Sequence, residues 1–288
     1  MKLLMMKRPV MKRPVMKRPV MKRPPAPLLG GLCILLVMVA FAVAPDLFTP
    51  YDPLAFDFGA LLAPPSWPHP FGTDQFGRDL LSRSIAATAI DLQIALFATV
   101  FPGLLGTLIG LLIGWYGGIA DAIFGRLVDL VVTFPFLVLV IAIVAILGPG
   151  LANMYIAVTI VGWVSYARLM RSEVMVQKSG EYVAACKVLG YSTPRILFRH
   201  ILPNAIRPVL VYAVTAMALA ILLGSSLGYL GLGAQPPTAE WGVLIADGKN
   251  FFTTAPWIAL FPGTVIVIAG LGFSLTGDGL ADLLEVKR

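Results

Sequence analysis

The sequence predicts an all-α, polytopic membrane protein with six transmembrane helices. Of its 288 residues, 58% are hydrophobic and only 13% are charged, and the mean hydropathy is +0.86. A soluble core of this size does not need so much apolar sequence. The basic residues are clustered, since nine of the 22 precede Pro24 and seven more lie between Arg168 and Arg207. Clusters that alternate with apolar spans follow the positive-inside rule, so we expect no nucleic-acid partner.

Residues 1–27 form a basic, low-complexity arm in which M-K-R-P-V recurs from Met6, Met11 and Met16. A proline every five residues excludes a helix, so we expect a disordered cytoplasmic arm that is suited to anionic membrane lipid. Residues 28–48 are the first predicted span. Their end resembles a signal-peptide cleavage site, but Pro45 follows directly and the run is long enough to cross a membrane, which favours an uncleaved anchor.

Residues 49–85 are polar and rich in proline, and they lack the basic bias of a cytoplasmic loop, so we place them outside the membrane. Residues 86–283 form the predicted core, with five further spans at about 91–116, 127–147, 152–170, 206–227 and 257–275. Residues 284–288 form a charged tail. With six spans both termini are cytoplasmic, and the inner segments hold 19 of the Lys and Arg residues while the outer loops hold three.

The second span carries a stripe of small residues, Gly106, Gly110, Gly114 and Gly118. A spacing of four places them on one face of a helix, which is typical of close packing between membrane helices. Two alternatives stay open from the sequence, a loosely packed helix and a surface that lines a substrate path.

The loop at residues 172–205 is a long, soluble-looking segment between apolar runs. Ser179 is the predicted cap of a short helix, and Glu181 lies in its first turn, where a carboxylate complements the helix dipole. Gly190 is the predicted stop. Thr193 is the predicted cap of a second short helix, with Pro194 at its first position, and Pro203 ends that turn or starts the next element. Such a unit is suited to docking by another protein, although a loop that merely packs under the membrane fits the spacing equally well.

Motifs of an enzyme are absent from the sequence. It contains no P-loop, nucleophile elbow or zinc motif. Cys33 and Cys186 are isolated, as are His69 and His200, so we expect no metal and no cofactor. The middle of each span is almost free of ionisable residues, which argues against a proton-coupled carrier. The sequence therefore indicates a pathway-forming protein whose energy comes from elsewhere.

The stretch from Glu181 to Pro203 resembles the EAA loop of bacterial ABC-transporter permease subunits, E-x-x-x-A-A-x-x-x-G with a distal L-P. Cys186 stands where the second alanine is usual. Three more stretches resemble the second, "C-type" permease of the dipeptide/oligopeptide/nickel branch: F-G-T-D-Q-F-G-R-D-L-L-S-R, G-L-G-A-Q-P-P-T-A-E-W-G and G-D-G-L-A-D. In the last of these, Ala281 replaces the more common basic residue.

The resemblance implies a type I ABC importer permease fold in the bacterial inner membrane. It also implies a homologous permease as partner in a heterodimer, two cytoplasmic ATPase subunits that bind the ATP, and an extracytoplasmic solute-binding protein. The residues that it assigns to ATPase coupling are Glu181, Ala184, Ala185, Cys186, Gly190, Leu202 and Pro203. Those in exterior family motifs are Gly72, Thr73, Asp74, Gly77, Arg78, Asp79, Glu240, Trp241 and Gly242.

In the coupling loop the resemblance gives each feature a role. Glu181 anchors the helix start, Gly190 allows the sharp turn, and a small face at Ala185 and Cys186 permits close approach. The expected substrates are di- and oligopeptides. The alternatives are nickel or a nickel chelate within the same family, a secondary carrier that needs no ATPase, and a purely structural scaffold.

Overall fold

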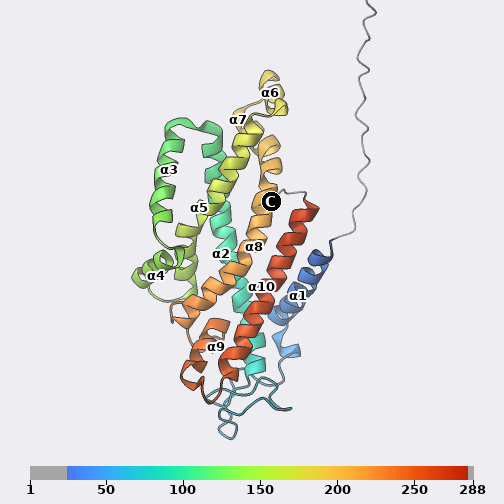
Figure 1. The fold of residues 1–288 in the computed structure, drawn as a ribbon, viewed down its shortest axis with the longest axis vertical. Helices are drawn as coiled ribbons and strands as arrows, with labels where there is room; N and C mark the ends of the chain where they lie inside the picture. Colours follow the sequence, from blue (N-terminus) through green and yellow to red (C-terminus); the bar gives the residue numbers. More distant parts are fainter. Residues whose placement is uncertain (1–24, 285–288) are drawn as a thin grey trace, which may run out of the picture.

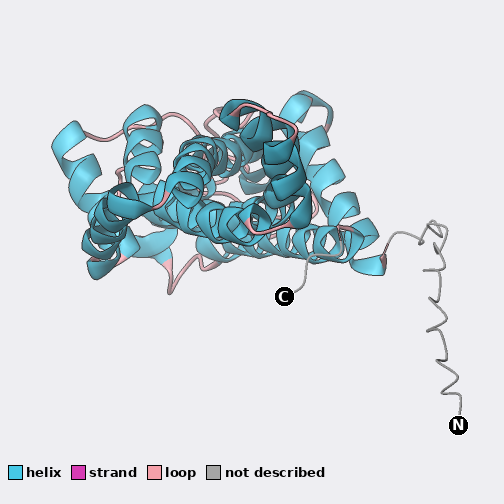
Figure 2. Cartoon of the chain, turned by 90° about the horizontal axis from the view of Figure 1, so that it is seen from above, coloured by secondary structure: helices cyan, strands magenta, loops and turns pink. Residues whose placement is uncertain are grey.

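The computed structural model describes residues 25–284, which fold almost entirely into helices (Figure 1, Figure 2). Within these residues the only β-type pairing is an isolated bridge between Thr73 and Asp79. The predicted all-α class is therefore confirmed. The M-K-R-P-V arm and the last four residues lie outside the described part of the chain, so the expectations for them stay predictions.

Ten α-helices follow one another along residues 25–284. They are α1 (Ala26–Val43), α2 (Leu80–Tyr116), α3 (Gly118–Thr133), α4 (Phe136–Leu147), α5 (Leu151–Lys178), α6 (Glu181–Val188), α7 (Thr193–Ile196), α8 (Leu202–Tyr229), α9 (Trp241–Gly248) and α10 (Trp257–Leu283). The long helices form an elongated bundle with α6 at one end, and with α9 and the loop before α2 at the other (Figure 1). We call these the α6 end and the α9 end.

Four helical stretches among the described residues are long and apolar enough to cross a membrane, namely Ala26–Val43, Leu80–Tyr116, Thr193–Tyr229 and Trp257–Leu283. The pair α3 and α4 also passes this test, as one span that is bent by 87°. The predicted fourth span falls in α5, which carries Asn153, Arg168 and Arg171 and does not pass. The structure thus supports four or five spans by this criterion, and the count of six stays a prediction.

The first two spans begin earlier than the sequence indicated. Helix α1 starts at Ala26, inside the stretch assigned to the disordered arm, because Pro25 can precede a helix without loss of a backbone hydrogen bond. Helix α2 starts at Leu80 and not near Asp91. The Asp79 carboxylate caps it by accepting a hydrogen bond from the backbone amide of Ser82 at 2.8 Å. The helix therefore continues well into the predicted outer loop.

The third predicted span, at residues 127–147, is broken. Phe134 is extended, with φ −93° and ψ 141°, and Pro135 follows it. Proline has no amide hydrogen to donate and disfavours the helical conformation for the preceding residue. The chain consequently turns by 87° between α3 and α4, which hydropathy alone could not reveal.

The fifth predicted span and the short helix before it are one continuous helical stretch, Thr193–Tyr229. A π-helical turn at Leu197–Ile201 joins α7 to α8, and the amide of Leu202 donates to the carbonyl of Leu197 across it. Pro203 lies in the first turn of α8. Of the two expectations for Pro203, that it ends a turn or that it starts the next element, the second agrees with the structure, because the first turn of a helix tolerates a residue that has no amide hydrogen.

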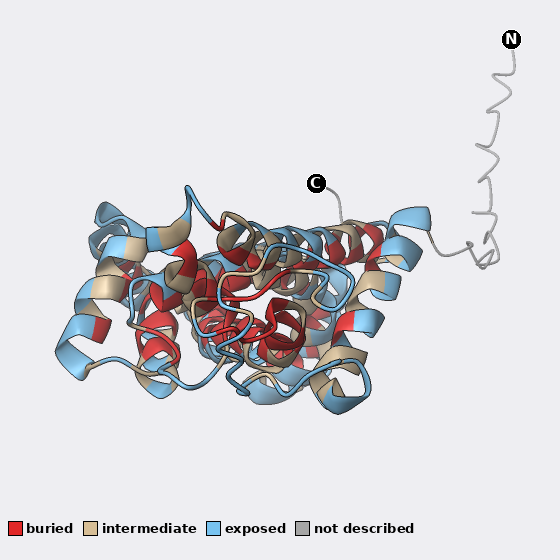
Figure 3. Cartoon of the chain, turned by 90° about the horizontal axis from the view of Figure 1, so that it is seen from below, coloured by how far each residue is buried: buried red, intermediate tan, exposed pale blue. Residues whose placement is uncertain are grey.

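The most extensive helix–helix contact joins α2 to α5, and α1 packs along α10. Seen from the α9 end, buried residues gather at the centre of the bundle and exposed residues surround them (Figure 3). A Cβ added at Gly106, Gly110 or Gly114 would meet the backbone of α5 at under 3.0 Å. These three glycines therefore let the two backbones touch. Gly118 lies outside this contact, since it begins α3 and faces open space.

Candidate functional site

Helix α6 lies at the tip of the bundle, and one of its faces packs against the long helices. Val183 and Cys186 are buried in a cluster with residues of α2, α5 and α7, among them Trp115, Val174 and Ile196. Spaced by three, Val183 and Cys186 form one stripe. A single stripe of contact fixes the helix and leaves the rest of its surface free.

A left-handed glycine ends α6. Gly190 has φ 74°, its amide donates to the carbonyl of Lys187 at 3.0 Å, and the amide of Tyr191 donates to the carbonyl of Cys186 at 3.0 Å. These are the two hydrogen bonds of a Schellman motif, in which glycine is strongly preferred because it has no Cβ. The expected stop at Gly190 is therefore what the structure shows.

The expected caps of the two short helices were wrong. Gly180 precedes α6, and the Ser179 hydroxyl instead donates to the carbonyl of Val176 at 2.8 Å, at the end of α5. Thr193 is the first residue of α7, which Ser192 precedes, and neither side chain caps it. A serine between two helices can serve either one, and the sequence does not say which.

The outer face of α6 is apolar and exposed. We define it as Tyr182, Ala184, Ala185, Val188 and Leu189. Val188 is 89% exposed and Leu189 is 68% exposed. Cys186 points the opposite way, into the protein. The expected small face of Ala185 with Cys186 was therefore wrong: Ala184 and Ala185 give the outer face its small residues, while Cys186 belongs to the buried stripe.

Three cationic side chains lie against aromatic rings next to α6. The ammonium groups of Lys178 and Lys187 lie 5.6 and 5.1 Å from the centre of the Trp115 ring, and the Arg195 guanidinium lies 4.3 Å from that of Tyr191. Glu181 is exposed in the first turn of α6. Of the other two residues assigned to coupling, Leu202 packs against the buried cluster and Pro203 is exposed.

The exterior family residues come together at the α9 end around the carboxylate of Asp74. Its Oδ2 accepts hydrogen bonds from Arg78 Nε at 2.6 Å and from Arg83 Nη1 at 2.9 Å, and its Oδ1 accepts the backbone amide of Arg78 at 3.0 Å. Both guanidiniums also approach Asp247 of α9, at 3.5 and 3.4 Å. Two cations and two carboxylates thus join the loop before α2 to α9.

Neighbouring residues support this ion network. Gly72 and Gly77 have φ 73° and 74°, and a Cβ at Gly72 would lie 2.7 Å from the carbonyl of Ala63. The Thr73 hydroxyl accepts the amide of Ala63 at 2.8 Å and donates to the carbonyl of Ala60. Asp79 Oδ1 pairs with His69 Nδ1 at 2.9 Å. The stretch from Gly72 to Asp79 is therefore a rigid loop that positions the start of α2.

Glu240, Trp241 and Gly242 fasten α9 to the long helices. The Glu240 carboxylate caps α9 by accepting the amides of Gly242 and Val243 at 2.8 and 3.0 Å. Burial raises the pKa of Glu240, an effect that these two hydrogen bonds oppose. Trp241 is fully buried and donates its indole N–H to the carbonyl of Ser84 at 3.0 Å, while its amide donates to Asp91 at 3.1 Å.

Sequence reasoning missed Asp91 and Asp247 as partners of these motifs. Asp91 appeared only as the start of the second span, and Asp247 lies 169 residues from Arg78. A lone acid next to an apolar run could have identified Asp91, because such a residue is rare unless it has a partner.

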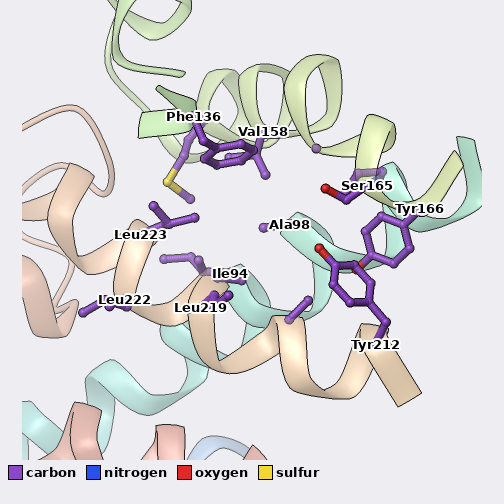
Figure 4. Close-up of a pocket in the computed structure, with 16 residues that line it drawn as sticks. Ile94, Ala98, Phe136, Val158, Ser165, Tyr166, Tyr212, Leu219, Leu222 and Leu223 are labelled. Atoms are coloured by element: carbon purple, nitrogen blue, oxygen red, sulfur yellow. The ribbon is translucent and has the colours of Figure 1, made fainter. Parts of the chain in front are cut away.

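A cavity of about 340 Å³ opens between α2, α4, α5 and α8 (Figure 4). Its wall is largely apolar, with residues such as Ile94, Phe136 and Leu223. Ser165, Tyr166 and Tyr212 gather on one side of it (Figure 4). A second pocket of about 750 Å³, lined by residues of α3, α5 and α8, shares Ser165 and Tyr212 with the first. Neither pocket was predicted from the sequence.

Comparison with known proteins agrees with these features. Residues 106–288 match the family described as binding-protein-dependent transport system inner membrane component. The chain is 41% identical to the dipeptide transport system permease protein DppC of Alkalihalophilus pseudofirmus, over 89% of this chain and 84% of that protein. It is 40% identical to the probable D,D-dipeptide transport system permease protein DdpC of Escherichia coli, over 91% and 88%.

A third relative is the glutathione transport system permease protein GsiD of Pectobacterium atrosepticum, which is 39% identical over 89% of this chain and 85% of that protein. The similarity includes the EAA loop, the exterior motifs and the helices between them, since it extends over most of each chain. The protein thus belongs to the family of inner membrane components of binding-protein-dependent transport systems.

Proposed function

We propose that this chain is a permease subunit of an ATP-driven importer of di- and oligopeptides. It forms the translocation path with a second, homologous permease. Its EAA loop couples the path to two separate ATPase subunits that bind the ATP, and a solute-binding protein delivers the peptide. The relatives described above are named for peptide or glutathione transport, so nickel import is not favoured.

The outer face of α6 is the observation that carries this proposal. An apolar surface that is exposed at the tip of a bundle needs a partner, because exposed hydrophobic patches mark contact sites. The buried stripe and the Schellman motif hold this face rigidly on α5 and α7. A movement of an ATPase that grips α6 is therefore transmitted to the long helices rather than absorbed by a flexible loop.

The orientation of the chain follows from charge. Seven Lys and Arg residues lie between Arg168 and Arg207, around the α6 end, and basic segments stay in the cytoplasm. We therefore assign the α6 end and both termini to the cytoplasm. The α9 end faces outward, where its rigid network of Asp74, Arg78 and Arg83 offers the solute-binding protein a fixed platform.

Gly190→Arg tests the docking assignment. Side chains other than glycine are strained at φ 74°, and an added Cβ there meets open space. An arginine therefore projects from the end of α6 without displacing the core. We expect normal amounts of the permease in the membrane, loss of ATPase co-purification, and loss of ATP-dependent uptake of a radiolabelled dipeptide in proteoliposomes that contain the whole importer.

Gly231→Arg is the matched control for co-purification. Gly231 also has φ 74° and open space around its Cβ position, but it lies beyond α8 at the α9 end. We expect this variant to keep its ATPase subunits. If Gly190→Arg retains the ATPases and transports normally, α6 is not the coupling element. If the unchanged importer takes up no peptide, the peptide assignment fails whatever the variants do.

A further inference from the structure

The two pockets form one continuous surface along α5. Val158 and Gly162 line the apolar cavity, Ser165 lines both pockets, and Leu169 and Ser172 line the second pocket. These five residues are spaced by three or four, so they follow a single face of the helix. Tyr212 of α8 also borders both pockets. A solute that moves along this face passes from an apolar region, past the hydroxyl groups of Ser165 and Tyr212, to the second pocket.

The second pocket differs from the first in its charge. Asp121, Asp129, Arg168 and Arg171 line it, whereas no charged residue lines the apolar cavity. Arg171 is already paired with Asp121, with Nη2 donating to Oδ2 at 2.7 Å. In the part of the chain that the structure describes, the side chains of Asp129 and Arg168 make no hydrogen bond or ion pair, and both residues are exposed. The pocket thus offers one carboxylate and one guanidinium for a ligand.

The place of these groups along the helix is consistent with the inner part of a path. Arg168 is 17 residues from Leu151, the first residue of α5, so about 25 Å of helix separates them. The hydrocarbon core of a membrane is about 30 Å thick, so Arg168 lies near the cytoplasmic boundary. Asp129 and Arg168 differ from other charges near this boundary because both line the second pocket, which is continuous with the apolar cavity.

A free peptide carries the complementary pair of charges. At neutral pH its α-amino group is largely an ammonium and its α-carboxyl group is a carboxylate. Both lose hydration when the peptide passes the apolar cavity, which is unfavourable unless new partners follow. Arginine binds a carboxylate through two parallel hydrogen bonds. The volume of about 750 Å³ also lies in the range of ordinary ligand pockets.

We propose that Asp129 and Arg168 form a transient binding site for the two charged termini of the transported peptide. Arg168 receives the C-terminal carboxylate and Asp129 receives the N-terminal ammonium, after the peptide has passed Ser165 and Tyr212. This site rests on the proposed peptide function. It assigns to this chain a contribution to substrate selection that is separate from that of the solute-binding protein.

The test measures uptake of a radiolabelled dipeptide and ATP hydrolysis in the same proteoliposomes, which contain the whole importer and peptide-loaded binding protein. We expect Arg168→Gln and Asp129→Asn each to lower the number of peptides moved per ATP about tenfold, which corresponds to about 1.4 kcal/mol. Binding-protein-stimulated ATP hydrolysis stays unchanged, because the coupling loop is intact. Arg168→Lys retains part of the uptake, since it keeps the positive charge but cannot form the two parallel hydrogen bonds.

Arg126→Gln is the control, because Arg126 is an exposed cation of α3 that does not line the pocket. We expect its uptake per ATP to equal that of the unchanged importer. Unchanged uptake per ATP in Arg168→Gln and Asp129→Asn overturns the site, and so does an equal loss in Arg126→Gln. If Arg168→Gln and Asp129→Asn lose ATP hydrolysis together with uptake, the result also counts against the proposed site, since Arg168 and Asp129 would then be needed for the fold. If the unchanged importer transports no peptide, the proposed function itself has failed.

Discussion

Gly110→Ala probes the close contact between α2 and α5. A Cβ at this position would lie 3.0 Å from both the Cα of Ala167 and the amide nitrogen of Arg171, and closer still to the carbonyl oxygen of Ala167. Carbon atoms in van der Waals contact are about 3.5–4.0 Å apart, so the helices must separate locally by about 0.5–1 Å. All three neighbouring atoms belong to the backbone, which cannot rotate out of the way as a side chain can.

The cost follows from two opposing effects. Overpacking of a tight contact lowers stability by about 1–3 kcal/mol. Alanine is at the same time a better helix former than glycine, by up to about 1 kcal/mol. Gly270→Ala separates these effects, because Gly270 lies within α10 and its Cβ position has no neighbour within 4 Å. The difference between the two variants is therefore the overpacking effect alone.

The assay is thermal unfolding of each purified variant in detergent. We expect Gly110→Ala to melt several degrees below Gly270→Ala, since about 1 kcal/mol shifts the midpoint by about 2–4 °C in proteins near this size. Gly270→Ala should melt at or above the unchanged protein. If Gly110→Ala melts as high as Gly270→Ala, the backbones of α2 and α5 are not in contact there and the packing argument is refuted.

Two further predictions concern the ion network at the α9 end. Asp74→Asn leaves the guanidiniums of Arg78 and Arg83, which are 8% and 3% exposed, without their main partner. Breaking a buried pair costs about 3–5 kcal/mol, so the melting temperature should fall sharply. Asp52→Asn, at an exposed carboxylate that only accepts the amide of Leu54, should barely change it, and equal melting of both variants would contradict the network. The second concerns Asp247, whose pKa burial raises above 3.8 although Arg78 opposes the effect. The folded state then binds this proton more tightly than the unfolded state, so stability is lost as pH rises above 3.8. Asp247→Asn should show a shallower decline in melting temperature as the pH rises above about 4, and an unchanged slope would speak against the shift.

Local patterns allowed several features to be predicted in place. Gly190 was identified as the end of α6 because a left-handed cap has few other solutions than glycine. The spacing of Gly106, Gly110 and Gly114 indicated one helix face, and that face meets α5 in the structure. Gly118 fits the same spacing, but the chain leaves the helix at Tyr116. Spacing defines a face only where the helix continues, and that depends on contacts elsewhere.

Features that depend on distant partners were not predictable in this way. Pro135 lies where a span is broken, while Pro102 and Pro208 lie within helices, so the residue type alone does not distinguish the two outcomes. The role of Cys186 was misjudged for a related reason. Whether a residue of a short helix faces a partner or the protein depends on which side the bundle covers.

Short-range features of the sequence were sufficient to predict the class of the molecule. Apolar runs long enough to cross a membrane, clustered basic residues and four motifs sufficed for an all-helical membrane permease, because hydropathy, charge and turn chemistry act over short distances. Which distant groups meet was evident from the fold alone. The fold places Asp247 beside Arg78, turns Cys186 inward, and brings Asp129 and Arg168 to one pocket. These pairings depend on how the helices pack, and the packing follows from the whole set of contacts.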